Sequence, residues 1–397
     1  MSVRKREWTT PSGVKKTAWL VDYRDPQGKR RAKQFTRKKE ADDFVTTAGW
    51  EVKQGTHTAD SKSITVAKAG EKWLARGKRE NLEDSTLDAY DQHVRLHINP
   101  FLGAKKLNQL TQPMIEEFRD QLLDTGRSRA MAIRVVRSLT SIVKEAKRLG
   151  HVAKNVCEDV TVQRKAREKE KVVPPTKEQI RALIKAADAM GNSRPMAKPM
   201  LMVFVYAGLR ASELRALAWR NVDLGKGTIT IDQRADRKNV IGPPKSAAGR
   251  RTIPMPPSAV AELKKWKLRC PASDLDLVFP SEAGTPIFWP NLVLGFQEPL
   301  QIAAGVTAPK KKSGKPVLDD KEQPVLAGLY GLHSFRHAAA SLWIEQRVPA
   351  KRVQTWMGHS SIQVTFDTYG HLFAALDDDS AVMAAMEAGV MGIEEAA

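Results

Sequence analysis

The sequence WMGHSSIQVTFDTYGHL, residues 356–372, is the stretch on which the interpretation of the whole chain turns. Ser360 and Ser361 are suitable N-caps, so the pattern predicts a short helix directly after His359. Tyr369 follows ten residues after that histidine. Taken alone, Tyr369 is more readily a packing residue with a polar tip than a reactive group. Its meaning therefore depends on the segments that precede it.

The first of these segments is AGLRASELRALAW, residues 207–219. Gly208 ends one predicted helix and a second begins shortly afterwards, which leaves Arg210 at the junction between them. Glu213 follows three residues later. A surface ion pair between the two is the plain alternative to a functional site.

Two further segments carry cations and a histidine. In PPKSAAGRRTIPMP, residues 243–256, Lys245 lies in a predicted turn before a strand. In GLHSFRHAAASLW, residues 331–343, His333 and Arg336 are one helical turn apart and share a face. Taken one at a time, Lys245 is better explained as a solvated lysine and His333 as a core histidine than as parts of a functional site.

Composition favours an anionic partner. The chain has 397 residues, a formal charge of +20 and a pI near 9.9, with 42% hydrophobic residues. It is long enough for more than one domain and hydrophobic enough to fold while carrying a large positive field. Nucleic acid is the expected partner, and a basic protein with no such partner is the alternative.

The sequence indicates no metal site, no disulfide framework and no membrane-spanning segment. Cys157 and Cys270 are far apart and have no neighbouring ligands at zinc spacing, so neither a disulfide framework nor a structural zinc is expected. His333 and His337 have the spacing of a metal pair but lack the HExxH glutamate. No signal peptide or membrane-length apolar run occurs, so we expect a cytoplasmic protein that acts on DNA in a bacterial cell, away from any membrane.

The N-terminal region is strongly basic. Residues 4–39 contain 13 Lys and Arg against three acids, with aromatic residues between them. Alternation in AWLVDYR and a turn at DPQG predict a small antiparallel sheet, followed by a short helix over 39–46. A cationic strand face suits a DNA groove, although a solvated surface looks similar. The candidate DNA-binding residues are Lys29, Arg30, Arg31, Lys33 and Arg37.

A helical region follows the polar stretch GTHTADSKS, residues 55–63, which is typical of a linker. Helical periodicity predicts a helix from Val66, then helices over 85–98, 114–123 and 128–149, which together form a compact four-helix unit. The charged stretch 163–176 ends in two prolines and predicts a domain boundary.

The last region is mixed. Helices are expected over 177–190 and 199–206, strands over 228–232 and 251–254, and helices again after Ser334. Residues 305–328 are rich in Lys, Pro and Gly and predict a long exposed loop. The tail, residues 377–397, has apolar residues at helical spacing, which suits docking on a neighbouring subunit or packing in cis.

Together the four segments resemble the tyrosine recombinase family, also called the phage integrase family, in the family's order. GLRASEL corresponds to its first arginine signature, KSAAGRRTIP to its lysine before a strand, HSFR to its HxxR motif and MGHSSIQVTFDTYGH to its terminal block. The helical unit resembles the family's core-site binding domain, and the basic sheet resembles the arm-site binding domain of the lambda-integrase type.

The resemblance implies a multidomain α+β fold. We expect a small three-stranded sheet plus helix (1–60), a four-helix core-binding domain (64–162) and a mixed, mainly helical catalytic domain with a tail helix (174–397). The expected partner is double-stranded DNA with core and arm attachment sites, bound by a homotetramer. Integration of a phage or mobile element is implied, with excision aided by an excisionase and a host DNA-bending protein.

The resemblance also implies DNA cleavage and rejoining through a 3′-phosphotyrosyl intermediate, without metal, ATP or another cofactor. The catalytic residues would be Arg210, Lys245, His333, Arg336, His359 and Tyr369, supported by Glu213. Arginine forks suit a phosphate. By analogy His333 is the base and Lys245 the general acid. Glu213 stands where the family more often has Asp, and Gly249 where it usually has Ser.

Two rival hypotheses predict different chemistry. A type IB topoisomerase-like enzyme would use a similar tyrosine as a monomer, and the basic N-terminal sheet and the tail argue against it. A non-catalytic DNA-binding regulator would explain the charge but not the ordered Arg, Lys, His-x-x-Arg, His and Tyr set. The sequence therefore favours a recombinase with two kinds of DNA site.

Overall fold

The computed structural model describes residues 1–163, 173–312, 315–374 and 379–391. Its chain divides into two compact units, Met1–Lys169 and Glu170–Ala397. Most of the predicted boundary at 163–176 lies outside the described residues. The first unit contains both the basic sheet and the helical region, so the finer division into three domains stays a prediction.

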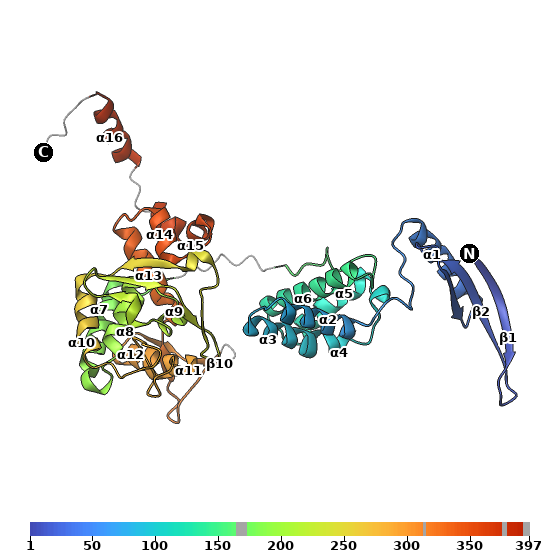
Figure 1. Cartoon of the computed structure of the whole chain (residues 1–397), viewed down its shortest axis with the longest axis horizontal. Helices are drawn as coiled ribbons and strands as arrows, with labels where there is room; N and C mark the ends of the chain where they lie inside the picture. Colours follow the sequence, from blue (N-terminus) through green and yellow to red (C-terminus); the bar gives the residue numbers. More distant parts are fainter. Residues whose placement is uncertain (164–172, 313–314, 375–378, 392–397) are drawn as a thin grey trace. The chain divides into compact units, whose positions relative to one another are not determined.

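The first unit begins with an antiparallel sheet of three strands in the order β1-β2-β3, covered on one face by a helix (Figure 1). Its elements are β1 (Ser2–Thr9), β2 (Lys15–Arg24), β3 (Arg30–Phe35) and α1 (Lys38–Lys53). Val21, Tyr23 and Ala41 form the buried core, and Phe44 and Val45 of the predicted helix pack against it. The helix is longer than predicted, since its amphipathic pattern continues beyond Thr46 to Val52, which also packs on the core.

The segment over residues 55–63 is not a free linker. Asp60 accepts a hydrogen bond from Asn108 Nδ2 at 2.5 Å and pairs with Lys33 Nζ at 2.9 Å. The Ser63 hydroxyl accepts from the backbone of Asn108 at 3.0 Å, and His57 is buried. Polar residues in this stretch are therefore used for tertiary contacts, which composition alone does not reveal.

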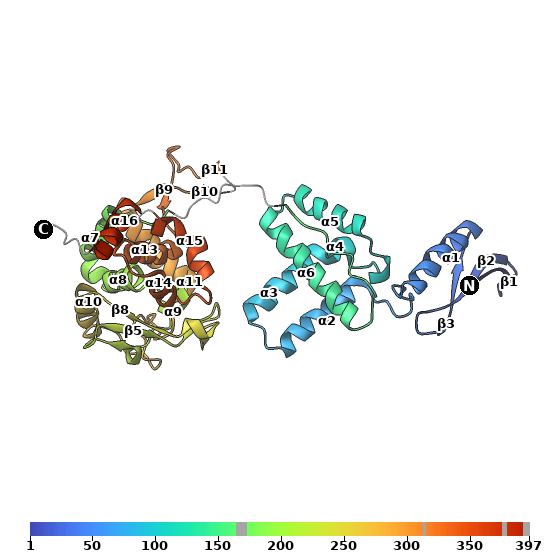
Figure 2. The same ribbon diagram turned by 90° about the horizontal axis from the view of Figure 1, so that it is seen from above.

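The helical part of the first unit packs around its longest helix, α6, which contacts α2, α5 and η1 (Figure 2). The elements are α2 (Val66–Arg79), α3 (Asp84–Gln92), η1 (His93–Ile98), α4 (Asn99–Leu102), η2 (Leu107–Gln109), α5 (Gln112–Asp124) and α6 (Arg129–Arg148). Thr65, Thr111 and Ser128 cap α2, α5 and α6 through their hydroxyls. The four predicted helices are present, and the second continues through the π turn η1 to Leu102.

The second unit is mainly helical. Its helices are α7 (Lys177–Met190), η3 (Gly191–Ser193), α8 (Ala197–Ala207), α9 (Ala211–Leu214), η4 (Trp219–Asn221), η5 (Ala247–Gly249), α10 (Pro257–Lys267), α11 (Trp289–Leu292), η6 (Val293–Gln297), α12 (Glu298–Ala303), α13 (Leu332–Glu345), α14 (Ala350–Met357), α15 (Ile362–Ala374) and α16 (Asp379–Met391). Helix α8 contacts α7, α10 and α13, and α13, α14 and α15 pack on one another.

Short antiparallel strands complete the second unit. They are β4 (Val222–Asp223), β5 (Thr228–Ile231), β6 (Arg234–Ala235), β7 (Ile241–Gly242), β8 (Arg251–Pro254), β9 (Thr307–Pro309), β10 (Lys311–Lys312), β11 (Lys315–Pro316) and β12 (Leu326–Gly328). The largest of these sheets has the order β4-β5-β8. The predicted α+β class is confirmed, and both predicted strands fall on β5 and β8.

Most described residues of the segment 305–328 are exposed, as predicted, but the segment is not a loop throughout, because it contains β9 to β12. Strand β12 pairs with β9, with Gly328 opposite Thr307, and β10 pairs with β11. The pairing of β9 with β12 joins residues from opposite ends of the segment, and β10 and β11 consist of Lys and Pro, which are poor local signals for strands. The segment therefore forms two short ribbons, the outer one ending at the residues that the structure does not describe.

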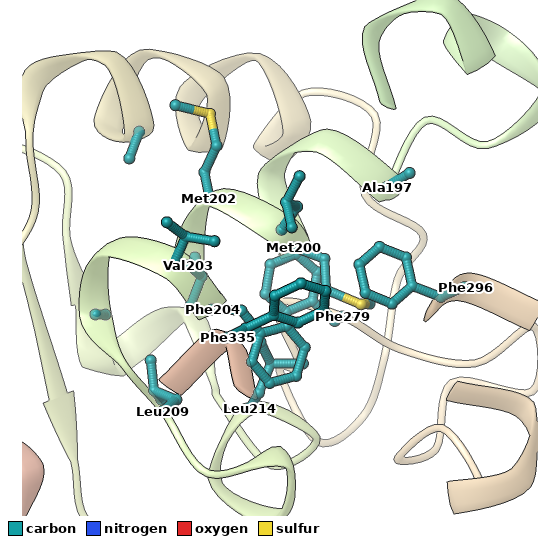
Figure 3. Close-up of a cluster of buried hydrophobic side chains, with 14 of the residues drawn as sticks. Ala197, Met200, Met202, Val203, Phe204, Leu209, Leu214, Phe279, Phe296 and Phe335 are labelled. Carbon is teal, nitrogen blue, oxygen red and sulfur yellow. The ribbon is translucent and has the colours of Figure 1, made fainter. Parts of the chain in front are cut away.

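Helix α8 is the centre of the hydrophobic core of the second unit (Figure 3). Phe204 stacks near Phe296 and Phe335, with ring centroids 6.4 and 6.2 Å apart. Leu209 and Leu214 are fully buried on either side of the junction that carries Arg210. Because these leucines anchor the junction, the backbone of Arg210 is held by the core.

Within the described part of the chain, no helix is both long enough and apolar enough to cross a bilayer.

Candidate active site

Arg210 lies at the junction between α8 and α9. Helix α8 ends in a left-handed residue, Gly208, with φ of 58°, which turns the chain before α9 begins. The backbone N–H and the Nη1 of Arg210 both donate to the Glu213 carboxylate, at 2.8 and 2.7 Å. Arg210 Nη2 donates to the carbonyl of Gly358 at 3.2 Å. The predicted Arg210–Glu213 pair is therefore a fixed part of a larger cluster.

Arg251 is the residue of this cluster that the sequence did not reveal. It lies on β8, and its Nη1 and Nη2 donate to Glu213 at 3.0 and 2.8 Å. Its Nε donates to the carbonyl of Trp356 at 2.7 Å. In the sequence it is one of many arginines, and only the buried carboxylate 38 residues upstream distinguishes it. Arg251 thereby joins the strand to the segment that precedes His359.

Glu213 is 3% exposed and lies between cations. Burial by itself raises the pKa of the carboxyl, but the hydrogen bonds from Arg251 and the charges of Arg251, Arg210 and Arg336 lower it to about 2. The carboxylate is therefore ionised throughout the neutral range. It orients two arginines at once, Arg210 and Arg251.

Arg336 is 1% exposed on α13 and is held by backbone carbonyls. Its Nη1 donates to Gly208 at 2.7 Å, and its Nη2 donates to Met357. Both carbonyls lie at the C-terminal ends of helices, where unpaired carbonyls carry partial negative charge. Burial and the charge of Arg210 lower the pKa of Arg336 to about 9 despite the opposing charge of Glu213, so the guanidinium stays charged at neutral pH.

Gly358 brings the Lys245 loop against this cluster. It is left-handed, with φ of 61°, and a Cβ there would lie 3.0 Å from the carbonyl oxygen of Ala248 and from Arg251 Nη1. Lys245 is exposed on this loop, three residues before Ala248. Gly249, at the position where the family usually has Ser, has no room for a side chain because a Cβ would lie 2.5 Å from Pro244 Cβ.

The three histidines near the cluster have different surroundings. His359 is half-buried, and its Nδ1 hydrogen bonds to the Thr365 hydroxyl at 3.0 Å. Burial and the charges of Arg336, Arg210 and Arg251 lower the pKa of His359 to about 4. His333 is exposed at the start of α13, and its ring lies edge-on to His337 with centroids 4.7 Å apart.

Tyr369 lies on α15 and is 3% exposed. Its hydroxyl hydrogen bonds to His337 Nδ1 at 2.7 Å. Burial raises the pKa of this hydroxyl, and the charge of Arg336 opposes that shift only in part. His337, which the sequence suggested only as half of a metal pair, follows directly after Arg336. The tyrosine is thus joined to the arginine cluster through α13.

These contacts bring Arg210, Glu213, Arg336, His359 and Tyr369 together from three separate segments of the sequence. Glu213 is bonded to two of the three guanidinium groups and feels the charge of the third, so a single buried carboxylate leaves an excess of positive charge. Such a site suits an anion with several oxygens, such as a phosphodiester. Among the described residues, no group of three ligating side chains is placed to hold a metal ion.

The basic sheet at the N-terminus has two different faces. Directly opposed residues of antiparallel strands share a face. Arg31 and Lys33 lie opposite Tyr23 and Val21, which are buried against α1. Arg31 pairs with buried Asp25 at 3.0 Å, while Lys33 pairs with Asp60. These two predicted DNA-binding residues therefore face the helix side of the sheet.

The other face of the sheet carries a different set of cations. Register places on it Arg4, Arg6, Lys16, Arg24 and Arg30, which we call the open sheet face. Arg30 is the only predicted residue among these five. Lys29 is exposed in the turn before β3, and Arg37 is exposed at the start of α1. Strand alternation was visible in the sequence, but which face α1 covers was not.

The comparisons with known proteins agree with this geometry. Residues 175–375 match the model of the phage integrase family, and residues 65–123 match the phage integrase N-terminal SAM-like domain. The first match covers the whole arginine cluster and Tyr369. The chain belongs to the phage integrase family.

Similar proteins include a tyrosine recombinase XerC-like protein of Caldanaerobacter subterraneus subsp. tengcongensis, 25% identical over 88% of this chain and 90% of that protein. An integrase of Streptomyces ambofaciens is 27% identical over 89% of each chain. The function class follows from these matches. This protein is a tyrosine-type site-specific recombinase, an enzyme that breaks and rejoins DNA.

Solved structures share the fold. The Tn1549 transposon integrase in complex with transposon right end DNA has a TM-score of 0.64 at 20% identity, and covers 82% of this chain and 99% of that chain. A lambda integrase tetramer bound to a Holliday junction has a TM-score of 0.55 at 18% identity, and covers 89% and 95%. Both comparisons support the predicted fold class.

Proposed function

We propose that this recombinase cleaves DNA by attack of the Tyr369 hydroxyl on a phosphodiester, which gives a 3′-phosphotyrosyl intermediate and a free 5′ hydroxyl. The bond to tyrosine conserves the energy of the phosphodiester, so a 5′ hydroxyl of another strand reverses the step without ATP. The observation that carries this proposal is the joining of Tyr369 to Arg336 through α13, beside a cluster that has more cations than carboxylates.

The arginines are assigned to the phosphate. Arg210 and Arg336 donate to its non-bridging oxygens, where charge accumulates during an in-line displacement. Their positions are set before DNA arrives, because Glu213 and the helix-end carbonyls hold them. Preorganised donors of this kind cost little reorganisation at the moment of reaction.

The remaining predicted residues act around this phosphate. Lys245, on the loop that reaches Gly358, protonates the leaving 5′ oxygen. His359 and His333 donate to phosphate oxygens or move protons, as imidazole does near neutral pH. A phosphate beside them supplies the negative charge that the cluster lacks, which would raise the low pKa of His359.

The wider role is integration of a phage or mobile element. We propose that the enzyme acts in the cytoplasm as a homotetramer on core sites, while the open sheet face binds arm sites. Excision would need an excisionase-type factor, and a host DNA-bending protein would bring arm and core sites together. Support comes from the family match and from the cationic face of the sheet.

Helix α16 supports assembly into a tetramer. Met383, Met386, Val390 and Met391 are exposed on it. We propose that this apolar surface docks on a neighbouring subunit, and packing in cis is the alternative. Replacing Met383 and Met386 by Gln should weaken synapsis of two core sites in gel shifts while single-site binding persists. Unaltered synapsis would favour cis packing.

The test of cleavage uses a core-site duplex nicked near the crossover point, so that the cleaved end is lost and the intermediate accumulates. Wild-type protein should form a covalent adduct, and Tyr369→Phe should form none. Tyr206→Phe, at a half-buried tyrosine on α8, is the matched control and should react like the wild type. An equal adduct yield from Tyr369→Phe would exclude the assignment.

A further inference from the structure

The hydrogen bond that the structure gives to the Tyr369 hydroxyl is with His337, at 2.7 Å from Nδ1. Both side chains are largely withdrawn from solvent, and the ring centroids are 5.6 Å apart. His333, which family analogy suggests as the base, is exposed and lies edge-on to the His337 ring. The group in contact with the reacting oxygen is therefore the second histidine of α13.

The direction of this hydrogen bond is set by the charge state and the tautomer of His337. Burial, together with the charges of His333 and Arg336, lowers the pKa of His337 to about 4. The imidazole is therefore neutral at neutral pH. Burial also raises the pKa of the tyrosine, so the phenol keeps its proton, and in the tautomer of His337 that is protonated on Nε2 the phenol donates to the lone pair of Nδ1. In that tautomer the proton of the nucleophile points at an acceptor.

We propose that His337 is a further catalytic residue, which takes the proton of the Tyr369 hydroxyl as that oxygen attacks the DNA phosphorus. This inference rests on the proposed function of Tyr369. It adds a role that the HxxR pattern does not assign, since His337 lies one residue beyond that pattern.

Every bond and proton in this step is accounted for. The Tyr369 O–H bond breaks, the proton passes to His337 Nδ1, and the phenolic oxygen forms the new bond to phosphorus. The bond between phosphorus and the 5′ oxygen breaks, and that oxygen takes a proton from a separate acid, for which Lys245 is proposed. When a 5′ hydroxyl reverses the step, protonated His337 returns its proton to the tyrosine oxygen.

The weak basicity of His337 fits a late proton transfer. As the bond to phosphorus forms, the phenol becomes far more acidic, so even a weak base accepts its proton. A bound phosphate also adds negative charge beside the cluster, which raises the pKa of His337. Arg336 and His337 are adjacent on one helix, and Gly208 and Met357 fix that helix through the guanidinium. The residue proposed to bind the phosphate, Arg336, and the residue proposed to accept the proton, His337, are therefore positioned by the same helix.

The test compares His337→Asn with the wild type in single-turnover cleavage of the nicked core-site duplex. Asn places an oxygen near the position of Nδ1 and keeps an acceptor, but it cannot take the proton. We expect a rate about 10²- to 10⁴-fold lower, the usual contribution of a positioned base. His371→Asn, at an exposed histidine two residues after Tyr369, is the control and should cleave at the wild-type rate.

A second substrate separates the base from the acid. Replacing the bridging 5′ oxygen by sulfur gives a leaving group that departs without a proton. This substrate should restore cleavage by Lys245→Ala but not by His337→Asn. Two results would overturn the inference. One is that the sulfur-substituted duplex restores the cleavage activity of His337→Asn, and the other is that His337→Asn cleaves the ordinary duplex at the wild-type rate.

The outcomes remain distinguishable from failure of the proposed function. No adduct with wild-type protein would reject the role of Tyr369 itself. An adduct with wild type and an equal rate with His337→Asn would reject only the role of His337. Thermal unfolding checks that the variant is folded, and His337→Gln, which suits a helix better than Asn, takes its place if it is not.

Discussion

The protein carries arginines in two contrasting settings, the cluster around Glu213 and the open sheet face. In the cluster, Arg251 and Arg336 are buried and every contact that positions them goes to a buried carboxylate or a backbone carbonyl. On the open sheet face, Arg4 and Arg30 are largely exposed and share Asp22 at 3.1 and 3.6 Å. The arginine side chains of the cluster are held in place by the surrounding structure, whereas those of the open sheet face extend into solvent.

The two settings suit two different tasks, one that depends on the exact positions of the arginines and one that depends mainly on their positive charge. A displacement reaction needs donors at fixed positions around one phosphorus. Binding to a DNA backbone needs positive charge along a surface, and its strength depends on counterion release. Substitutions that keep the charge but change the shape should therefore damage the cluster and spare the sheet.

The largest effect should come from Arg336→Lys. Lysine keeps the charge but cannot reach the carbonyls of Gly208 and Met357 and also present a planar fork to the phosphate. We expect single-turnover cleavage to fall about 10²- to 10³-fold, as for loss of one transition-state donor. The matching change Arg30→Lys should alter arm-site affinity only slightly. A small effect of Arg336→Lys on the cleavage rate would contradict preorganisation of the cluster.

The next effect concerns stability. The folded pKa of Glu213 is about 2 against an ordinary value of 4.5, so its contribution is complete above pH 4.5 and is lost as the pH falls through 2. Glu213→Gln should lower the free energy of unfolding at pH 7 by on the order of 3 kcal/mol. The gap between variant and wild type should close only within that acid window, as measured by denaturant unfolding.

Asp22→Asn is the comparison for that measurement, because Asp22 pairs with exposed arginines on the open sheet face. Its loss should change stability by less than about 1 kcal/mol. Equal losses from the two carboxylates would mean that the Glu213 cluster is no more tightly coupled than a surface pair.

A smaller difference in stability is expected between alanine substitutions at two glycines, one beside the cluster and one in the N-terminal sheet. Gly358→Ala puts a methyl group at φ of 61° and 3.0 Å from Ala248 and Arg251, so it should cost about 2 kcal/mol or more. Gly28, in the turn between β2 and β3, has φ of 77°, but a methyl group there would have no atom within 4 Å. Gly28→Ala should therefore cost only the strain, about 1 kcal/mol. Thermal unfolding of both variants measures the difference.

The smallest effect expected per residue is on the open sheet face. Arg24→Ala and Arg30→Ala together should lower the slope of log affinity against log salt for arm DNA by about 2, one for each lost phosphate contact. Cleavage of a saturated core site should not change. An unchanged salt slope would indicate that this face does not contact the DNA backbone.

The resemblance to the recombinase family marked the candidate residues, and the sequence predicted their placement where the signal is local. Gly208 and Arg210 follow from a helix end, and His333 and Arg336 from helical spacing. Their environments were not predictable: Arg336 is buried while His333 is exposed, because packing of α13 on α8 decides which side is covered. Arg251 and His337 were missed because their partners, Glu213 and Tyr369, lie 38 and 32 residues away. Within 305–328, the pairing of β9 with β12 was missed because the partners lie at opposite ends of the segment, and β10 and β11 were missed because Lys and Pro are poor strand formers.

Cleavage through Tyr369 is tested most directly by the chemical identity of the covalent intermediate. Wild-type protein is trapped on a nicked core-site duplex, digested with protease, and the peptide that carries nucleotide is sequenced by mass spectrometry. We expect a nucleotide joined through its 3′ phosphate to Tyr369, with a free 5′ hydroxyl on the released strand. Attachment to another residue, or a 5′ phosphate linkage with a free 3′ hydroxyl, would contradict the proposed chemistry.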